Sequence, residues 1–107
     1  MPKHLTKENF AAEVLEASKT KPVLVDFHAE WCGPCQIQAP IVEDTATAFE
    51  GKAIVGELDA DQAMEIAREY GVMSIPTLLI FKNGEMVEKF VGVQEQETLS
   101  AGLTKHL

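Results

Sequence analysis

Two cysteines are the residues of this chain whose type and spacing best suit chemistry. Cys32 and Cys35 are its only cysteines, and Gly33 and Pro34 separate them. Residues three apart in a helical turn are neighbours at about 5–6 Å, which is within reach of a disulfide bond. The pair can therefore form and break one bond. In a chain that alternates strands and helices, this spacing predicts thiol redox chemistry.

The two sulfurs are expected to differ in exposure. A row of helical positions starts at Cys35 and continues through Ala39, Val42, Ala46 and Phe49. If this apolar row faces the core, Cys35 points inward and Cys32 is the exposed cysteine at the helix N-terminus. The partial positive charge and the unpaired N–H groups of a helix N-terminus stabilise a thiolate. Cys32 is thus predicted to be the nucleophile.

Asp26 is the third candidate residue. It is the one charged residue in Val23–Phe27, a segment with the pattern of a central strand covered on both faces. Burial raises the pKa of a carboxyl group toward the range useful for acid–base catalysis. We therefore predict that Asp26 takes the proton from Cys35. The alternative is a misread strand with a carboxylate that points to solvent.

Two structural roles compete with redox chemistry for the cysteine pair. A zinc site would need further ligands, and His4, His28 and His106 lack the short spacing of a structural zinc site. A static disulfide between residues this close would close a very small loop and remove little entropy from the unfolded chain. Redox chemistry is therefore favoured over both.

Length, composition and charge limit the possible functions. The chain has 107 residues, of which 46% are hydrophobic, and this predicts one domain over residues 1–107 with a single core. A formal net charge of −8 argues against nucleic acid and anionic lipid as partners. The apolar runs are shorter than the about 20 residues of a membrane span. Met1–His4 shows no targeting signal, so a cytoplasmic location is expected.

The elements that must position these residues alternate along the chain. A first helix is expected to begin at Thr6, a second to follow Cys35 and to kink at Pro40, and Asp61 to cap a short third helix. Asn83-Gly84 predicts a hairpin, and a terminal helix carries Leu99 and Leu103. The expected strands are 3–5, 23–27, 53–59, 77–81 and 85–91. This order places helices on both faces of a mixed sheet.

These motifs together closely resemble the thioredoxin family. The resemblance is carried by Val25 to Cys35, Ala39-Pro40, Ile75 to Leu78, Phe81 to Gly84 and Val91-Gly92, in order and at matching spacing over nearly the whole chain. Trp-Cys-Gly-Pro-Cys with an upstream aspartate and a downstream Ile-Pro-Thr is far more specific than a bare cysteine pair. The resemblance implies an α/β thioredoxin fold, with a central mixed five-stranded sheet flanked by four helices.

The resemblance also implies an activity and its partners. It implies a thiol–disulfide oxidoreductase that reduces protein disulfides through Cys32 and Cys35 and is recycled by thioredoxin reductase. NADPH and FAD would belong to that reductase, and the chain itself, a monomer, would bind no cofactor or metal. By general thiol chemistry, Cys32 attacks a substrate sulfur, and Cys35 then resolves the mixed disulfide.

A docking surface beside the cysteines follows from the same resemblance. Read from the sequence alone, Pro76 is a trans proline at the start of a strand. The family resemblance instead implies a cis proline against the dithiol, with Ile75 pairing by its backbone with an extended substrate. The expected substrate-binding residues are Trp31, Gly33, Pro34, Ile75, Pro76 and Gly92, together with Val72 and Val93.

Three positions depart from the family pattern. Position 28 is His instead of the usual Trp, and Gln36 and Glu57 stand where Lys is common. Gln36 makes the field near Cys32 less positive, and Glu57, if the strands align, raises the pKa of Asp26 further. His28 is either a packed neutral residue or a proton-exchanging neighbour of the site.

Two other functions stay open at this point. One is a non-catalytic thioredoxin-fold subunit that binds another protein. The other is a dithiol oxidant, which is disfavoured because Gly33-Pro34 resembles the reducing members and because no secretion signal is present.

Overall fold

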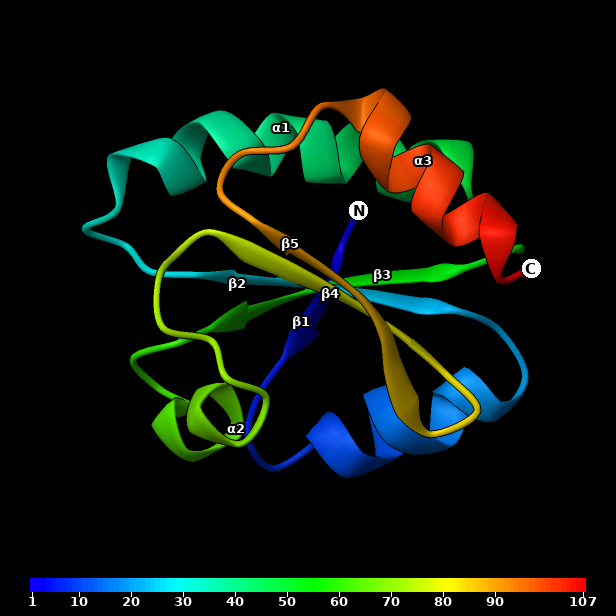
Figure 1. The fold of residues 1–107 in the computed structure, drawn as a ribbon, viewed down its shortest axis with the longest axis horizontal. Coiled ribbons are helices and arrows are strands. Elements are labelled where there is room, and N and C mark those ends of the chain that lie inside the picture. Colours follow the sequence, from blue (N-terminus) through cyan, green and yellow to red (C-terminus); the bar gives the residue numbers. More distant parts are fainter.

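A five-stranded mixed sheet lies between two layers of helices in the computed structural model, which describes residues 1–107 (Figure 1). The strands are β1 (Lys3–Leu5), β2 (Val23–His28), β3 (Ile54–Asp59), β4 (Thr77–Lys82) and β5 (Glu85–Val91). Their order in the sheet is β1-β3-β2-β4-β5. β3 pairs in parallel with β1 and β2, whereas β4 is antiparallel to β2 and β5. The predicted thioredoxin fold is confirmed.

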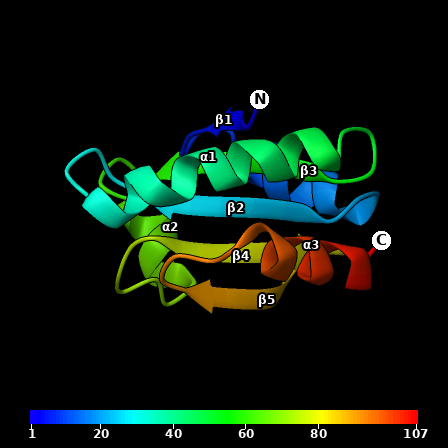
Figure 2. The same cartoon turned by 90° about the horizontal axis from the view of Figure 1, so that it is seen from above.

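Helices cover both faces of the sheet. α1 (Gly33–Ala48) and α3 (Gln96–Lys105) lie on one face. α2 (Met64–Glu69) and the first helical segment, which is π-helical over Ala11–Glu16 (η1) and 3₁₀-helical over Ala17–Lys19 (η2), lie on the other (Figures 1 and 2). With η1 and η2 as one segment, these are the four expected helices. No helix has both the length and the apolar character to cross a lipid bilayer.

Two hydrophobic clusters hold the layers on the central strand β2. Val23, Val25 and Phe27 pack with the first helical segment and α2, through side chains such as Phe10, Val14 and Ala67. Leu24 on the opposite face joins a second cluster with α1 and α3, through Val42, Leu99 and Leu103. Burial on both faces explains why Val23–Phe27 lacks polar alternation. The same burial encloses Asp26.

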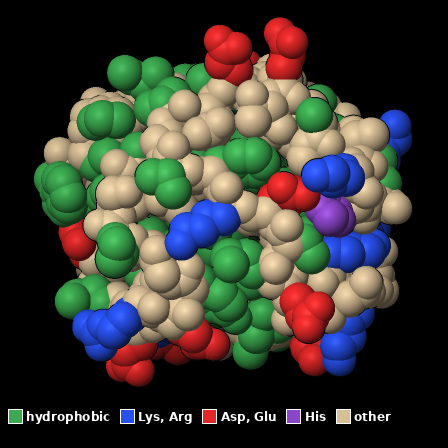
Figure 3. Space-filling view, viewed as in Figure 1, with side chains coloured by type: hydrophobic (Ala, Val, Ile, Leu, Met, Phe, Trp, Pro, Cys, Tyr) green, Lys and Arg blue, Asp and Glu red, His purple; other side chains and the backbone are tan.

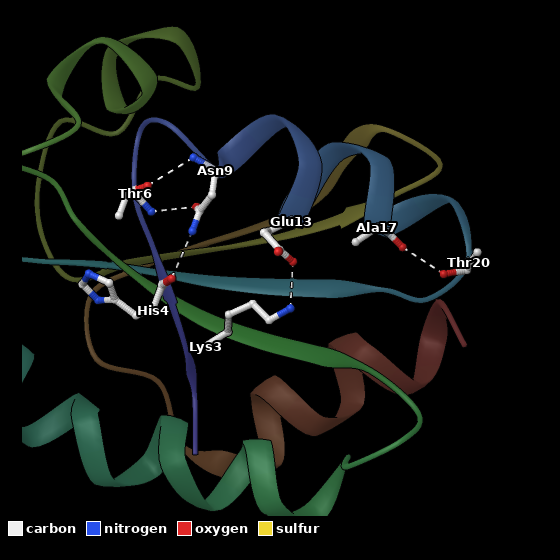
Figure 4. Close-up of polar contacts among 7 residues, drawn as sticks. All are labelled: Lys3, His4, Thr6, Asn9, Glu13, Ala17 and Thr20. Carbon is white, nitrogen blue, oxygen red and sulfur yellow. Dashed lines mark hydrogen bonds and ion pairs between the residues drawn. The ribbon is translucent and has the colours of Figure 1, made fainter.

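The first helical segment begins at Ala11, with Phe10 as its N-cap residue, and therefore later than the predicted start at Thr6. The Thr6 backbone N–H donates to Asn9 Oδ1 at 2.8 Å, and the Asn9 backbone N–H donates to Thr6 Oγ1 at 3.1 Å (Figure 4). These reciprocal bonds close the turn that precedes the helix, and Thr6 is not the N-cap residue. Lys3 on β1 also forms an ion pair with Glu13 at 2.8 Å. The segment that follows is π-helical and then 3₁₀-helical instead of regular α-helix.

The inward face of α1 differs in part from the prediction. Its buried residues are Cys35, Gln38, Val42 and Thr45, followed by Phe49 just after the helix. Ala39 is exposed and Ala46 only half-buried, so the predicted apolar row was wrong at these two positions. Gln38 and Thr45 can be buried because hydrogen bonds satisfy their polar atoms.

Two turn predictions had different outcomes. Asn83 and Gly84 adopt φ angles of 57° and 80°, as the two-residue hairpin turn between β4 and β5 requires. Asp61 does not cap α2, whose N-cap residue is Ala63 without a side-chain cap. The Asp61 carboxylate instead accepts a hydrogen bond from Trp31.

Candidate functional site

Cys32 and Cys35 form a disulfide at the N-terminus of α1, and their Cα atoms are 5.3 Å apart. Cys32 is the N-cap residue of the helix, and its Sγ accepts the Cys35 backbone N–H at 3.1 Å. Pro34 fits the first turn because a proline there removes an N–H that has no partner within the helix. The helix N-terminus therefore places Cys32 where a thiolate is stabilised.

Both cysteines are buried, which corrects the prediction that Cys32 would be exposed. Cys32 is 3% exposed and Cys35 4%. They form a small apolar cluster with Ala29, and Ile75 packs against it. Ile75 belongs to the segment before β4, far from Cys32 in the sequence. The helical phase of α1 therefore could not show that Ile75 shields Cys32 from solvent. The neighbouring Trp31, Gly33 and Pro34 are exposed.

Asp26 on β2 is nearly inaccessible to solvent. It is 2% exposed, and its Oδ1 atom has no hydrogen-bond partner in the protein. Asp26 and Cys35 both line a pocket of about 200 Å³. Burial, and secondarily the charge of Glu57, raises the pKa of Asp26 to about 7. The alternative of a solvent-facing carboxylate is therefore excluded.

The three departures from the family pattern line this same pocket. Glu57 is in register with Asp26 across β2 and β3, as the strand alignment predicted. Gln36 and the half-buried His28 are the other two lining residues of this group. The two interpretations of His28 stay predictions, because its position fits both.

A cis peptide bond joins Ile75 to Pro76 beside the disulfide, as the family resemblance implied. The Ile75 carbonyl oxygen lies 3.8 Å from Cys32 Sγ. The Gly92 backbone N–H donates to the Pro76 carbonyl oxygen at 2.9 Å. Ile75 thus lies against Cys32, and Gly92 from a separate loop is bonded to the neighbouring Pro76.

Trp31 extends the site away from the disulfide. Its side chain is 72% exposed, and its indole Nε1–H donates to Asp61 Oδ2 at 2.7 Å. Trp31 also lines a pocket of about 680 Å³ that continues along α2 and the loop before β4. The other lining residues are Ala60, Asp61, Met64, Ala67, Arg68, Gly71, Val72, Met73, Ser74 and Ile75. Hydrophobic side chains gather at this end of the molecule, on the left of Figure 3.

Of this pocket wall, sequence reasoning assigned only Trp31, Val72 and Ile75 to the docking surface. Among the residues that it missed, three have large apolar or hydrogen-bonding side chains. Met64 and Met73 are large apolar side chains that are 59% and 94% exposed, and Asp61 bonds to the indole. The exposure of the two methionines is visible only in the structure, where large exposed apolar groups often mark an interaction surface. The partner of the Trp31 indole had no local sequence signal.

No set of three or more His, Cys, Asp or Glu side chains is grouped so that it could hold a metal ion. The groups that can react at this site are the disulfide and the buried carboxyl group of Asp26. A dithiol at a helix N-terminus can pass two electrons and two protons to another disulfide.

Comparison with known proteins points to one family. The thioredoxin family model matches residues 1–105. Thioredoxin 1 of Nostoc sp. is 47% identical over 103 residues, which cover 96% of this chain and 94% of that protein. A thioredoxin of Chlorobaculum thiosulfatiphilum is 42% identical over 95% of this chain and 93% of its own length. A thioredoxin of Staphylococcus aureus is 52% identical over 78% of this chain and 81% of its own length.

Proposed function

This chain belongs to the thioredoxin family and is a thiol–disulfide oxidoreductase that reduces protein disulfides, and from that premise we propose how its own residues divide the reaction. Cys32 is the attacking sulfur, Cys35 is the resolving sulfur and Asp26 is the base. The observation that carries this assignment is the pocket shared by Asp26 and Cys35, next to a Cys32 that caps α1.

The proposed reaction balances in two steps. The Cys32 thiolate attacks one sulfur of a substrate disulfide, a mixed disulfide forms, and the other substrate sulfur leaves as a thiolate. Cys35 then gives its proton to Asp26 and attacks Cys32 Sγ, which releases the second substrate sulfur. The substrate has gained two electrons, and the cysteine pair has become the disulfide of this structure.

Substrate docking is proposed for the exposed surface around Cys32. Trp31, Gly33 and Pro34 surround the disulfide on the helix side. Ile75, Pro76 and Gly92 provide the backbone side, where an extended substrate segment can form main-chain hydrogen bonds. Such contacts tolerate many sequences, in keeping with a reductase for many proteins.

The family implies disulfide-containing substrates and a reductase that renews the dithiol. We further propose that this reductase is a thioredoxin reductase that uses NADPH and FAD, and that the chain works as a single-domain monomer over residues 1–107 in the cytoplasm. The thioredoxin family match over residues 1–105 and the bacterial thioredoxin relatives support this proposal.

Trapping the mixed disulfide tests the division of roles. A Cys35→Ser variant should form a stable covalent adduct with a protein disulfide such as that of insulin, because the resolving step is lost. A Cys32→Ser variant should form no adduct and should lose reductase-coupled turnover. Adducts that form with Cys32→Ser but not with Cys35→Ser would reverse the assignment. If the chain were a non-catalytic binding subunit, the wild type would also show no reductase-coupled turnover.

A further inference from the structure

Gln38 is a fully buried polar side chain that the reaction above does not use. It lies on α1 and is 0% exposed. Its Oε1 accepts the Gln94 backbone N–H at 2.7 Å, and its Nε2 donates to the Gln94 carbonyl oxygen at 3.1 Å. The amide thus bonds at both ends to the backbone of one residue in the loop between β5 and α3.

The loop that Gln38 holds is also bonded to Pro76, which follows Ile75 at the disulfide. The Gln94 side chain donates to the carbonyl oxygens of Val91 and Gly92 at 3.2 Å each. The Gly92 N–H in turn donates to the Pro76 carbonyl. The loop is therefore bonded on one side to the helix that begins at Cys32 and on the other side to Pro76.

Packing alone does not call for a glutamine at this position. An apolar side chain of similar size, such as methionine, would fill the same space without polar atoms to satisfy. What glutamine adds is a pair of hydrogen bonds to Gln94. Without them, two backbone groups of the loop would lose their partners on α1.

The held loop presents groups suited to contact a protein. Val91 and Val93 are 60% and 41% exposed, and Gly92 between them has a φ of 89°, which favours glycine. A loop already fixed in its bound shape loses less conformational entropy when a partner docks. A fixed loop therefore favours docking of a protein and does not change the thiol exchange at Cys32.

We propose that Gln38 is a positioning residue that fixes the Val91–Gln94 loop for docking of disulfide-containing proteins. The inference rests on the proposed docking role of Gly92. It separates affinity for a protein substrate, which depends on Gln38, from thiol exchange at Cys32, which does not.

A Gln38→Met variant tests this separation. We expect the KM for a protein disulfide to rise about fivefold, in line with the loss of hydrogen bonds that are each modest in net worth. The kcat, and the rate with the small disulfide 5,5′-dithiobis(2-nitrobenzoate), should stay at the wild-type values. Equal losses with both substrates, or an unchanged KM for the protein, would overturn the proposal.

Thr45→Val is the matched control on the same helix. Thr45 is also fully buried, but its Oγ1 donates to the Ile41 carbonyl oxygen at 2.8 Å, within α1 and not to the loop. This variant loses a buried hydrogen bond on α1 and should keep the wild-type KM. A KM that rises as much as in Gln38→Met would overturn the proposal, because general loosening of α1 would then explain both.

Amide hydrogen exchange provides a readout that needs no turnover. The Gln94 N–H should exchange faster in Gln38→Met and stay protected in Thr45→Val. Should Gln38→Met fail to fold, Gln38→Leu is the second variant, because it removes both hydrogen bonds to Gln94 without burying a charge. This variant should raise the KM for the protein disulfide and leave the rate with the small disulfide unchanged. Unchanged Gln94 exchange in the folded variant would overturn the proposal, whatever the fate of the proposed cysteine roles.

Discussion

Asp26 on β2 lies in register with Glu57 on β3, and both carboxyl groups line the pocket that reaches Cys35. Burial is the larger cause that raises the pKa of Asp26 to about 7, and the charge of Glu57 is the second. A base with this pKa is partly ionised near neutral pH. It can therefore accept a proton from Cys35 during reduction and release it afterwards.

Replacing Glu57 by glutamine should lower the pKa of Asp26. The Glu57→Gln variant removes the like charge but keeps the size of the side chain and the burial of Asp26. Because burial is the larger cause, the pKa should fall only part of the way toward 3.8. Carboxyl carbon NMR over a pH series measures this directly.

Glu30→Gln is the control for that experiment. Glu30 lines the same pocket, but it is exposed and does not pair with Asp26 across the strands. Its loss should leave the Asp26 pKa close to the wild-type value. A Glu57→Gln variant in which Asp26 titrates as in the wild type would show that burial alone sets the pKa.

Replacing Asp26 by asparagine should stabilise the oxidised protein at high pH and not at low pH. Between the unfolded value of 3.8 and the folded value of about 7, the folded state holds a proton that the unfolded state has lost. The free energy of unfolding therefore falls as pH rises through this window. Above it the ionised carboxylate costs the fold about 4 kcal/mol, a cost that Asp26→Asn does not carry.

Urea unfolding of the wild type and of Asp26→Asn at about pH 8.5 and about pH 4 checks this prediction. The gain in the free energy of unfolding caused by the substitution should be larger at the higher pH. Asp44→Asn on the exposed side of α1 serves as the control and should show little difference between them. If Asp26→Asn changed the free energy of unfolding equally at both pH values, the raised pKa of Asp26 would not be the cause.

Local patterns were enough to predict most of the fold. The buried run Val23–Phe27 indicated the central strand, and Asn83-Gly84 indicated the hairpin, because each signal lies within a few adjacent residues. The pairing of Asp26 with Glu57 could be stated only on the condition that the strands align. The family resemblance supplied the cis bond before Pro76, which the residue pattern alone did not favour.

Features that depend on distant partners could not be predicted. Gln38 is buried because Gln94, 56 residues away, satisfies its amide, and hydrophobic periodicity assigns a polar residue to the outside. Cys32 is covered by Ile75, 43 residues away. Both features concern side chains whose surroundings come from loops that are distant in the sequence, about which helical phase carries no information.

Trp31 and Asp61 provide a test of how the docking surface is held. Trp31 is the only tryptophan of the chain, so its fluorescence reports on this one position. In an Asp61→Ala variant the exposed indole loses its acceptor at 2.7 Å. We expect lower fluorescence anisotropy and a KM for protein disulfides raised about two- to fivefold, because a hydrogen bond to a charged group at the surface contributes about 1 kcal/mol.

Asp61→Asn separates the hydrogen bond from the charge. Asparagine keeps an oxygen that can accept the indole N–H, so this variant should recover most of the anisotropy and of the affinity for the protein substrate. The Asp61 backbone N–H donates to Asp59 Oδ1 at 2.9 Å, and neither substitution removes that bond, so the loop before α2 stays in place. Wild-type anisotropy in Asp61→Ala would mean that packing alone, and not Asp61, orients Trp31 beside the disulfide.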